Sequence, residues 1–168
     1  MNFLQNHKEF KKNLFKKENI FYFTIIIIIF FLDRVSKLNI INRFNENTYY
    51  INDFINFDLI WNIGIGFGFF STDSNIVYNF ISLVIALVII FLIYIFILSE
   101  TLDKVIYAVI LGGAFGNFYD RLVYKAVPDF IDLHYNNFHW FTFNLADIFI
   151  TIGIIFFVIK NLLTKEKK

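Results

Sequence analysis

Pairs of amide and carboxylate side chains recur along this 168-residue chain at helical spacing. Asn117 and Asp120 form one pair and Asn144 and Asp147 another, so each pair lies on one helix face. An amide one turn from a carboxylate supplies the hydrogen bonds that a buried acid requires. Two carboxyl groups that share a proton can activate water, one as general base and one as general acid. The pattern favours acid–base chemistry.

Other catalytic chemistries find little support in the residues. The chain has no cysteine, which excludes disulfides, thiolate metal sites and a cysteine nucleophile. His7, His134 and His139 form no His-Glu-x-x-His motif, so we expect no metal and no cofactor and interpret His134 and His139 as interface residues. Ser36 and Lys37 are adjacent and point to different helix faces, which argues against a Ser/Lys dyad.

The composition indicates an integral membrane protein. Hydrophobic residues make up 58% of the chain and aromatic residues 21%, and the mean hydropathy is +0.61. The formal net charge is only +1, so no basic surface suggests a nucleic-acid partner.

The apolar segments predict one domain over residues 1–168 with four transmembrane helices. Ile76–Leu98 carries no charge and is long enough for a hydrocarbon core of ~30 Å. The glycines and alanine of the third segment would let helices pack closely. The four predicted spans are about 21–38, 76–98, 105–119 and 140–159.

The distribution of basic residues sets the orientation, because short cytoplasmic segments are rich in lysine and arginine. Ten of the 15 lysines and arginines lie before the first span, between the second and third, or after the fourth. Both termini are therefore expected in the cytoplasm. On the outer side, Ile55–Leu59 alternates apolar and polar residues, which predicts a strand. The expected fold class is an all-α membrane protein with a small extracytoplasmic β element.

This topology brings the polar residues of the spans to one depth, the outer ends of the first, third and fourth helices. Asp33 and Lys37 are four residues apart and are expected to pair on one helix face. Ionisable residues at membrane depth are costly and therefore candidates for function. The alternative is that these groups simply meet water at the membrane interface. The group comprises Asp33, Lys37, Asn117, Asp120, Asn144 and Asp147.

Five motifs, in this order, resemble the lipoprotein signal peptidases (signal peptidase II), and the resemblance extends from Phe21 to Ile159. The motifs are Asp33–Lys37, Asn62–Phe67, Gly112–Arg121, Val127–Asp132 and Phe143–Asp147. The chain departs from the usual pattern at Gly66, at Lys125, where the family usually has glycine, and at Pro128.

The resemblance implies an aspartyl endopeptidase, a multi-pass protein of the bacterial cytoplasmic (inner) membrane. Such an enzyme removes signal peptides from diacylglyceryl-modified prolipoproteins at the outer face. Lipid-modified precursors and membrane lipids are then its partners, and we expect a monomer. The catalytic pair matches Asp129 and Asp147. Supporting positions match Asp33, Lys37, Asn62, Gly64, Asn117, Asp120, Arg121 and Asn144.

Two other functions are compatible with carboxylates at helix ends. A small proton- or cation-coupled transporter would predict discontinuous helices and an inverted repeat, neither of which is visible in the sequence. A non-catalytic membrane assembly factor would have no need of convergent Asn/Asp pairs.

Overall fold

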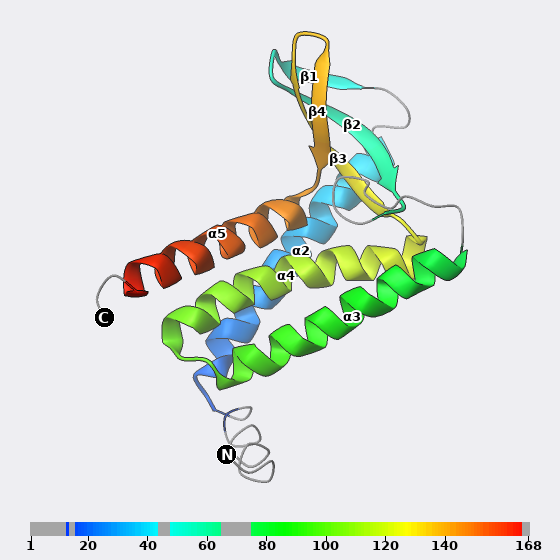
Figure 1. The fold of residues 1–168 in the computed structure, drawn as a ribbon. Helices are drawn as coiled ribbons and strands as arrows, with labels where there is room; N and C mark the ends of the chain where they lie inside the picture. Colours follow the sequence, from blue (N-terminus) through cyan, green and yellow to red (C-terminus); the bar gives the residue numbers. More distant parts are fainter. Residues whose placement is uncertain (1–12, 14–15, 44–47, 65–74, 166–168) are drawn as a thin grey trace.

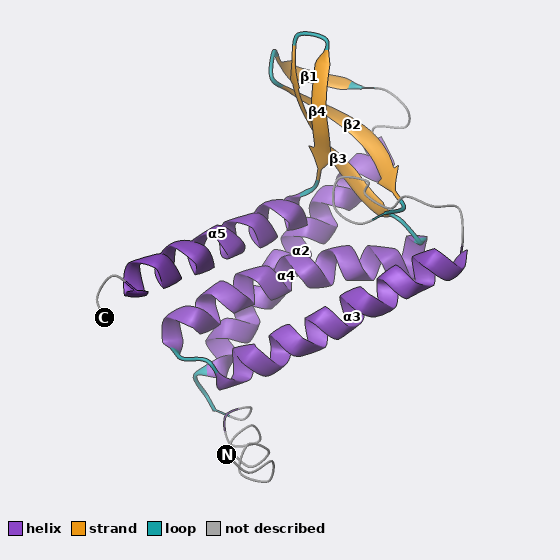
Figure 2. Cartoon of the chain, in the orientation of Figure 1, coloured by secondary structure: helices purple, strands orange, loops and turns teal. Residues whose placement is uncertain are grey.

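The computed structural model describes residues 13, 16–43, 48–64 and 75–165, and consists of a helical bundle that carries a β-sheet at one end (Figures 1 and 2). The helices are α2 (Asn19–Arg43), α3 (Asn75–Leu98), α4 (Thr101–Tyr124) and α5 (Leu145–Lys165). The strands are β1 (Tyr49–Asn52), β2 (Ile55–Asn62), β3 (Val127–Tyr135) and β4 (Phe138–Phe143).

Helix α4 is the centre of the bundle, since it packs against α2, α3 and α5. The interior contains aromatic and aliphatic side chains from α2, α3 and α4, including Tyr22, Phe96 and Leu111. At Gly116 an added Cβ would collide with the Asp33 carboxylate of α2, and at Gly113 it would lie 2.5 Å from the Ala146 carbonyl oxygen of α5. Two glycines therefore let α4 approach both neighbours, as the small residues predicted.

The strands form an antiparallel sheet in the order β1-β2-β3-β4. The strand predicted from the alternation at Ile55–Leu59 is confirmed as part of β2. The β3–β4 hairpin was not predicted. As an inner strand, β3 is buried along most of its first half, so its sequence does not alternate between apolar and polar residues. Asn136, in the turn of this hairpin, has a φ of 51°, a backbone conformation that asparagine tolerates.

The chain passes from the bundle into β3 through a left-handed residue. Lys125 caps the C-terminus of α4 with φ 55° and ψ 25°. This conformation favours glycine, which is the residue that the resemblance leads one to expect there. Pro128 follows in β3, paired in register with Trp61 of β2.

The fourth predicted span began too early. We expected it to start at Trp140, but this residue belongs to β4, and α5 starts at Leu145. The segment before Asn144 pairs with β3, with Phe143 opposite Ile131 and Phe141 opposite Leu133. Hydropathy alone does not distinguish an apolar strand from the first turn of an apolar helix. The third helix, α4, in turn extends beyond the predicted 105–119 at both ends.

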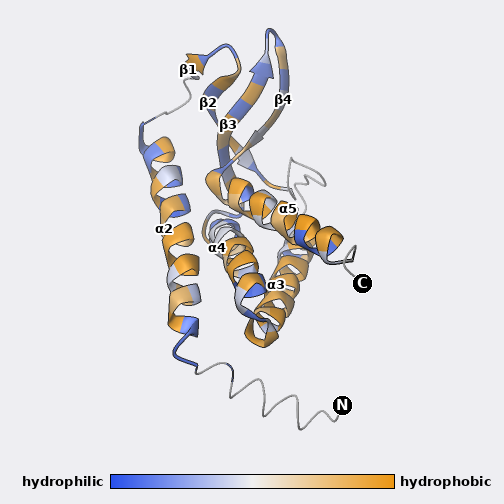
Figure 3. Ribbon diagram, turned by 90° about the vertical axis from the view of Figure 1, so that its left-hand side faces the viewer, coloured by the Kyte–Doolittle hydropathy of each residue, from blue (hydrophilic) through white to orange (hydrophobic). Residues whose placement is uncertain are grey.

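Two of the described helices are long and apolar enough to cross a membrane, Ile76–Leu98 and Leu145–Thr164. Figure 3 shows α3 as almost continuously apolar, and many of its large side chains, such as Ile76 and Phe80, are exposed. Exposed apolar surface of this kind is suited to contact with lipid. The predicted fold class is confirmed in its helical majority and its small sheet; that all four helices cross the membrane stays a prediction.

Helices α2, α3, α4 and α5 each have one end near the sheet. Figure 1 shows the C-terminal ends of α2 and α4 and the N-terminal ends of α3 and α5 toward the sheet, with the α3–α4 connection at the opposite end. Asp33, Asn117 and Asp147 belong to the sheet-side halves of their helices. Residues from α2, α4, α5 and β3 can therefore meet there.

Candidate active site

Asp129 lies on β3 and is held by two amides from other elements. Its Oδ2 accepts a hydrogen bond of 2.9 Å from Asn62 Nδ2, and its Oδ1 accepts one of 2.5 Å from Asn144 Nδ2. Asn62, at the end of β2, is itself oriented because its Oδ1 accepts a bond from the Gly64 backbone N–H at 2.9 Å. The Asp129 residue is only 3% exposed. Its carboxyl group is therefore fixed in position by β2 and by the start of α5.

Asp147 lies in the first turn of α5 and takes part in a reciprocal cap. Asn144 Oδ1 accepts a bond of 3.0 Å from the Asp147 N–H, and Asp147 Oδ2 accepts one of 3.2 Å from the Asn144 N–H. This is a capping box with asparagine at the N-cap and aspartate three residues later. The free amide group of Asn144 donates to Asp129. Asn144 thus joins the two aspartates through its own hydrogen bonds.

A buried ion pair on α2 is connected to Asp147 through Asn117. Asn117 Nδ2 donates to Asp147 Oδ1 at 2.7 Å, while Asn117 Oδ1 accepts a bond of 2.8 Å from Lys37 Nζ. The predicted pair on α2 is confirmed, with 2.8 Å between Lys37 Nζ and Asp33 Oδ2. Asp33 Oδ1 also accepts a bond of 3.0 Å from the Ala146 N–H of α5. The pair therefore connects α2 to both α4 and the first turn of α5.

Asp120 is neutralised by cations of α2 and not by Arg121, its neighbour in sequence. It forms ion pairs with Arg34 and with Lys37, the latter at 2.7 Å. Successive helix residues point in different directions, so Arg121 turns instead to carbonyl oxygens. It donates to the backbone oxygens of Asn117 and Gly64, each at 3.1 Å.

A cavity of about 350 Å³ opens beside the two aspartates. One part of its wall is polar and the rest is aliphatic. It is lined by Asn62, Ile85, Ala114, Asn117, Arg121, Val127, Asp129, Asn144, Asp147, Ile150, Thr151 and Ile154. An apolar pocket with a few converging polar groups is the usual form of a ligand-binding site.

Burial raises the pKa of Asp129 from its ordinary value of 3.8 to about 6. The negative charge of nearby Asp147 acts in the same direction, whereas the hydrogen bonds from Asn62 and Asn144 oppose the shift. A carboxyl group tuned toward neutral pH is suited to proton transfer.

The structure brings all ten predicted site residues into one connected region. Seven of them touch through the bonds and ion pairs above, and Asn62, Gly64 and Arg121 join through Asp129 and Asn117. Gly66, within the second motif, lies outside the described residues. Sequence reasoning missed the aliphatic wall, including Ile85 and Ile150, because its residues resemble any others in an apolar helix. The small residue Ala114, next to the glycines of α4, was the sequence feature that could have indicated that wall.

Comparison with known proteins identifies the family. A profile described as "Signal peptidase (SPase) II" matches residues 25–163. The chain belongs to the signal peptidase II family. A protein of Pelagibacter ubique called lipoprotein signal peptidase is 49% identical over 147 residues, which cover 86% of this chain and 89% of that protein. The lipoprotein signal peptidase of Francisella tularensis subsp. novicida is 38% identical over 152 residues, covering 87% and 94% of the respective chains.

Solved structures of bacterial membrane enzymes have a similar fold. A bacterial membrane enzyme determined by the in meso method at 2.3 Å resolution superposes with a TM-score of 0.77 and 27% identity, covering 88% of this chain and 90% of that one. A second, at 1.9 Å, has a TM-score of 0.70, also with 27% identity, and covers 84% and 92%. The family match includes every residue that lines the cavity.

Proposed function

We propose that this protein is an aspartyl endopeptidase that removes signal peptides from diacylglyceryl-modified prolipoproteins at the outer face of the bacterial inner membrane. The single observation that carries the proposal is the pairing of Asp129 with Asp147 through Asn144 at the wall of a cavity. Membership of the signal peptidase II family supports the substrate class. The two relatives described above are both called lipoprotein signal peptidases.

The two carboxyl groups divide the proton transfers of peptide hydrolysis. The raised pKa of Asp129 favours a proton on the pair near neutral pH, and the carboxyl group that holds this proton gives it to the substrate carbonyl oxygen. The other carboxyl group, as a carboxylate, takes a proton from water while the water oxygen bonds to the carbonyl carbon. The resulting gem-diol collapses as the carboxyl group that took the proton from water gives it to the peptide nitrogen, the other carboxylate takes a proton from one diol hydroxyl, and the C–N bond breaks, which restores both groups to their starting states. No covalent enzyme intermediate is required.

The surroundings of the aspartates fit a substrate that arrives from the membrane. A helical signal peptide must unwind before cleavage, and its freed backbone groups then need polar partners. Asn62, Asn117 and Arg121 line one part of the cavity and can provide them. The aliphatic wall suits the apolar side chains of the signal peptide. Each CH₂ of the acyl chains that stays in lipid contributes ~0.8 kcal/mol to membrane retention of the substrate.

In this proposal all four helices cross the membrane, both termini are cytoplasmic, and the enzyme acts as a monomer. The sheet then lies on the outer side, next to the aspartates. The structure does not support the transporter alternative. A transporter would predict discontinuous helices, whereas α2, α3, α4 and α5 are continuous over their described lengths.

The test is a cleavage assay with purified protein in detergent micelles. Two precursor peptides of identical sequence are compared, one carrying diacylglyceryl on its cysteine and the other unmodified, with Asp129→Asn as the inactive control. We expect cleavage of the lipidated peptide only. Equal cleavage of both would overturn recognition of the lipid, and cleavage of neither would overturn the peptidase assignment.

A further inference from the structure

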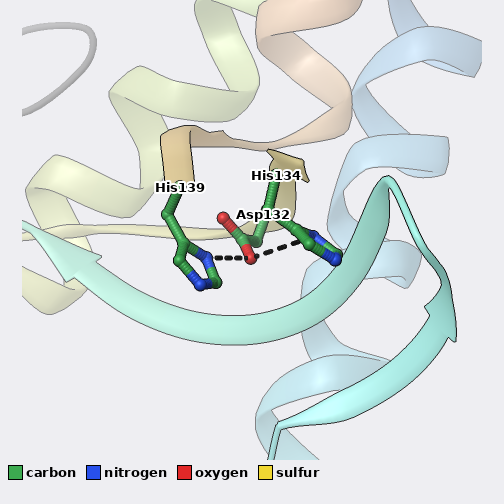
Figure 4. Close-up of side chains that lie close together, drawn as sticks. All are labelled: Asp132, His134 and His139. Carbon is green, nitrogen blue, oxygen red and sulfur yellow. Dashed lines mark hydrogen bonds and ion pairs between the residues drawn. The ribbon is translucent and has the colours of Figure 1, made fainter. Parts of the chain in front are cut away.

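The β3–β4 hairpin carries a second cluster of titratable side chains, which the proposed hydrolysis does not use. Figure 4 shows the rings of His134 and His139 on either side of the Asp132 carboxylate. His139 Nδ1 lies 2.7 Å from Asp132 Oδ2, and His134 Nδ1 lies 3.6 Å from the same oxygen. One ligand atom from each of the three residues falls within 4.8 Å of the others. Three potential metal ligands thus converge on one point.

An ion pair with Asp132 does not account for the buried position of His134. Its side chain is only 8% exposed, and its buried Nδ1 has no hydrogen-bond partner among the described residues. The 3.6 Å to Asp132 Oδ2 is too long for a hydrogen bond. A buried polar atom normally has a partner, so a partner is expected for this nitrogen, which points toward the carboxylate.

A second unpartnered atom belongs to the neighbouring strand. Asn56 of β2 lies opposite Asp132 in register, and residues directly opposite in a sheet share a face. The Asn56 residue is buried, and its Oδ1 has no hydrogen-bond partner within the described part of the chain. Asn56 thus adds a second buried atom with unused lone pairs on the face of the sheet that carries Asp132.

Although the sequence motifs predict no metal, we propose that Asp132, His134 and His139 bind a divalent transition-metal ion of the zinc class. Two imidazoles and a carboxylate are ligands typical of Zn²⁺, which binds such atoms at about 2.0–2.2 Å in tetrahedral geometry. Ligand atoms of such a site are roughly 3.3 Å apart by that geometry, close to the observed 3.6 Å between His134 and Asp132. The His139 side chain, 59% exposed, is free to adjust, and it leaves solvent access for a fourth ligand.

The position of the cluster indicates what the ion would do. His134 and His139 are cross-strand partners, next to a register shift between Leu133 and His134. A bound ion would fasten β3 to β4 at this irregular point. Asp129 precedes Asp132 on β3, and β4 leads directly to Asn144. The ion would therefore stabilise the hairpin whose two strands position the aspartates, without contacting the substrate.

The test uses full-length protein in detergent, stripped of metal and free of any histidine tag. Zinc chloride is titrated by calorimetry, and Co²⁺ is added separately to record its visible absorption. We expect one equivalent to bind, a tetrahedral Co²⁺ spectrum, and a rise in Tm with Zn²⁺ but not with Mg²⁺, which prefers oxygen ligands. His139→Gln should weaken Zn²⁺ binding by at least about tenfold. Because this side chain is largely exposed, the variant should fold.

Two controls assign the binding to the cluster. His7→Gln removes the third histidine of the chain and should leave affinity unchanged. Asp129→Asn should also bind Zn²⁺ normally, which separates the cluster from the aspartate pair. Absence of stoichiometric Zn²⁺ binding at micromolar concentration, or wild-type affinity in His139→Gln, would overturn the proposal. Neither result depends on cleavage activity, so the proposed peptidase function is tested separately.

Discussion

At the scale of single residues, Asn144 uses three polar groups to hold the two aspartates. Its Oδ1 and backbone N–H complete the α5 cap with Asp147, and its Nδ2 is left to donate to Asp129. An aspartate at this position would lack that donor and would add a third negative charge. The chemistry of the two acids therefore depends on one amide whose orientation the helix cap determines.

Replacement of either acid by its amide should abolish cleavage. Asp129→Asn and Asp147→Asn each remove one proton-transfer group, and we expect a loss of at least about 10³-fold in kcat/KM with the fold retained. The double variant should be little worse, since the two groups act as a unit. Cleavage of the lipidated peptide and circular dichroism provide the measurements. The matched control is Asp53→Asn, in the exposed β1–β2 turn, which should keep full activity. Near-normal turnover by well-folded Asp129→Asn would refute the assignment.

The raised pKa of Asp129 predicts how stability depends on pH. Between its ordinary pKa of 3.8 and about 6 in the folded protein, the unfolded chain loses this proton while the folded protein keeps it. The stabilising contribution is therefore complete below pH 3.8 and is lost as pH rises to about 6, by up to ~3 kcal/mol. We expect the Tm of the wild type, relative to Asp129→Asn, to fall over this range and then level off. A constant difference in Tm would show that Asp129 titrates normally.

At the scale of elements, the junction of α2, α4 and α5 depends on Lys37. This fully buried ammonium contacts Asp33 of its own helix, and Asp120 and Asn117 of α4. Asn117 in turn holds Asp147. Removal of one partner from a buried ionic group leaves an uncompensated charge, which is far more costly than the loss of an exposed pair.

Lys37→Met should therefore lower stability and activity together. We expect a loss of about 3–5 kcal/mol, because two carboxylates lose their shared cation. Thermal unfolding in detergent and the cleavage assay measure the two effects. Lys160→Met is the matched control, since Lys160 pairs with Asp103 where both side chains are partly exposed. That variant should cost at most about 1 kcal/mol and leave activity intact. Equal effects of the two substitutions would mean that the buried junction has no special role.

At the scale of the whole molecule, the two ends of the helical bundle carry different elements. The sheet and the aspartates lie at one end of the helices, and the α3–α4 connection lies at the other (Figure 1). Lys160 and Asp103 bridge α4 and α5 in the halves away from the sheet. If the chain spans the membrane as proposed, the sheet end faces outward.

Single cysteines can test this orientation, because the natural chain contains none. Asp53→Cys places a thiol in the β1–β2 turn, and Glu100→Cys places one between α3 and α4. A membrane-impermeant maleimide should label Asp53→Cys in cells with a permeable outer envelope. It should label Glu100→Cys only after the inner membrane is broken. The reverse pattern would invert the topology, and labelling of both in intact cells would refute a four-span arrangement.

Much of this protein could be predicted from local sequence. Apolar runs longer than the bilayer needs, such as Ile76–Leu98, have one stable solution because every backbone group must be bonded within the helix. The pairing of Asp33 with Lys37 follows from helical spacing alone. The five motifs indicate the family without any knowledge of contacts, since their residue types and order are specific.

Other features were decided only by the tertiary structure. That Arg34 and Lys37, rather than Arg121, neutralise Asp120 depends on how α2 packs on α4 at Gly116. Trp140 does not begin a helix, because the strand that contains it pairs with β3. Whether an apolar segment forms a strand or a helix depends on the partners that the tertiary structure places beside it. The cluster around Asp132 likewise needs two paired strands. Contacts between elements distant in sequence depend on packing, which local spacing does not encode.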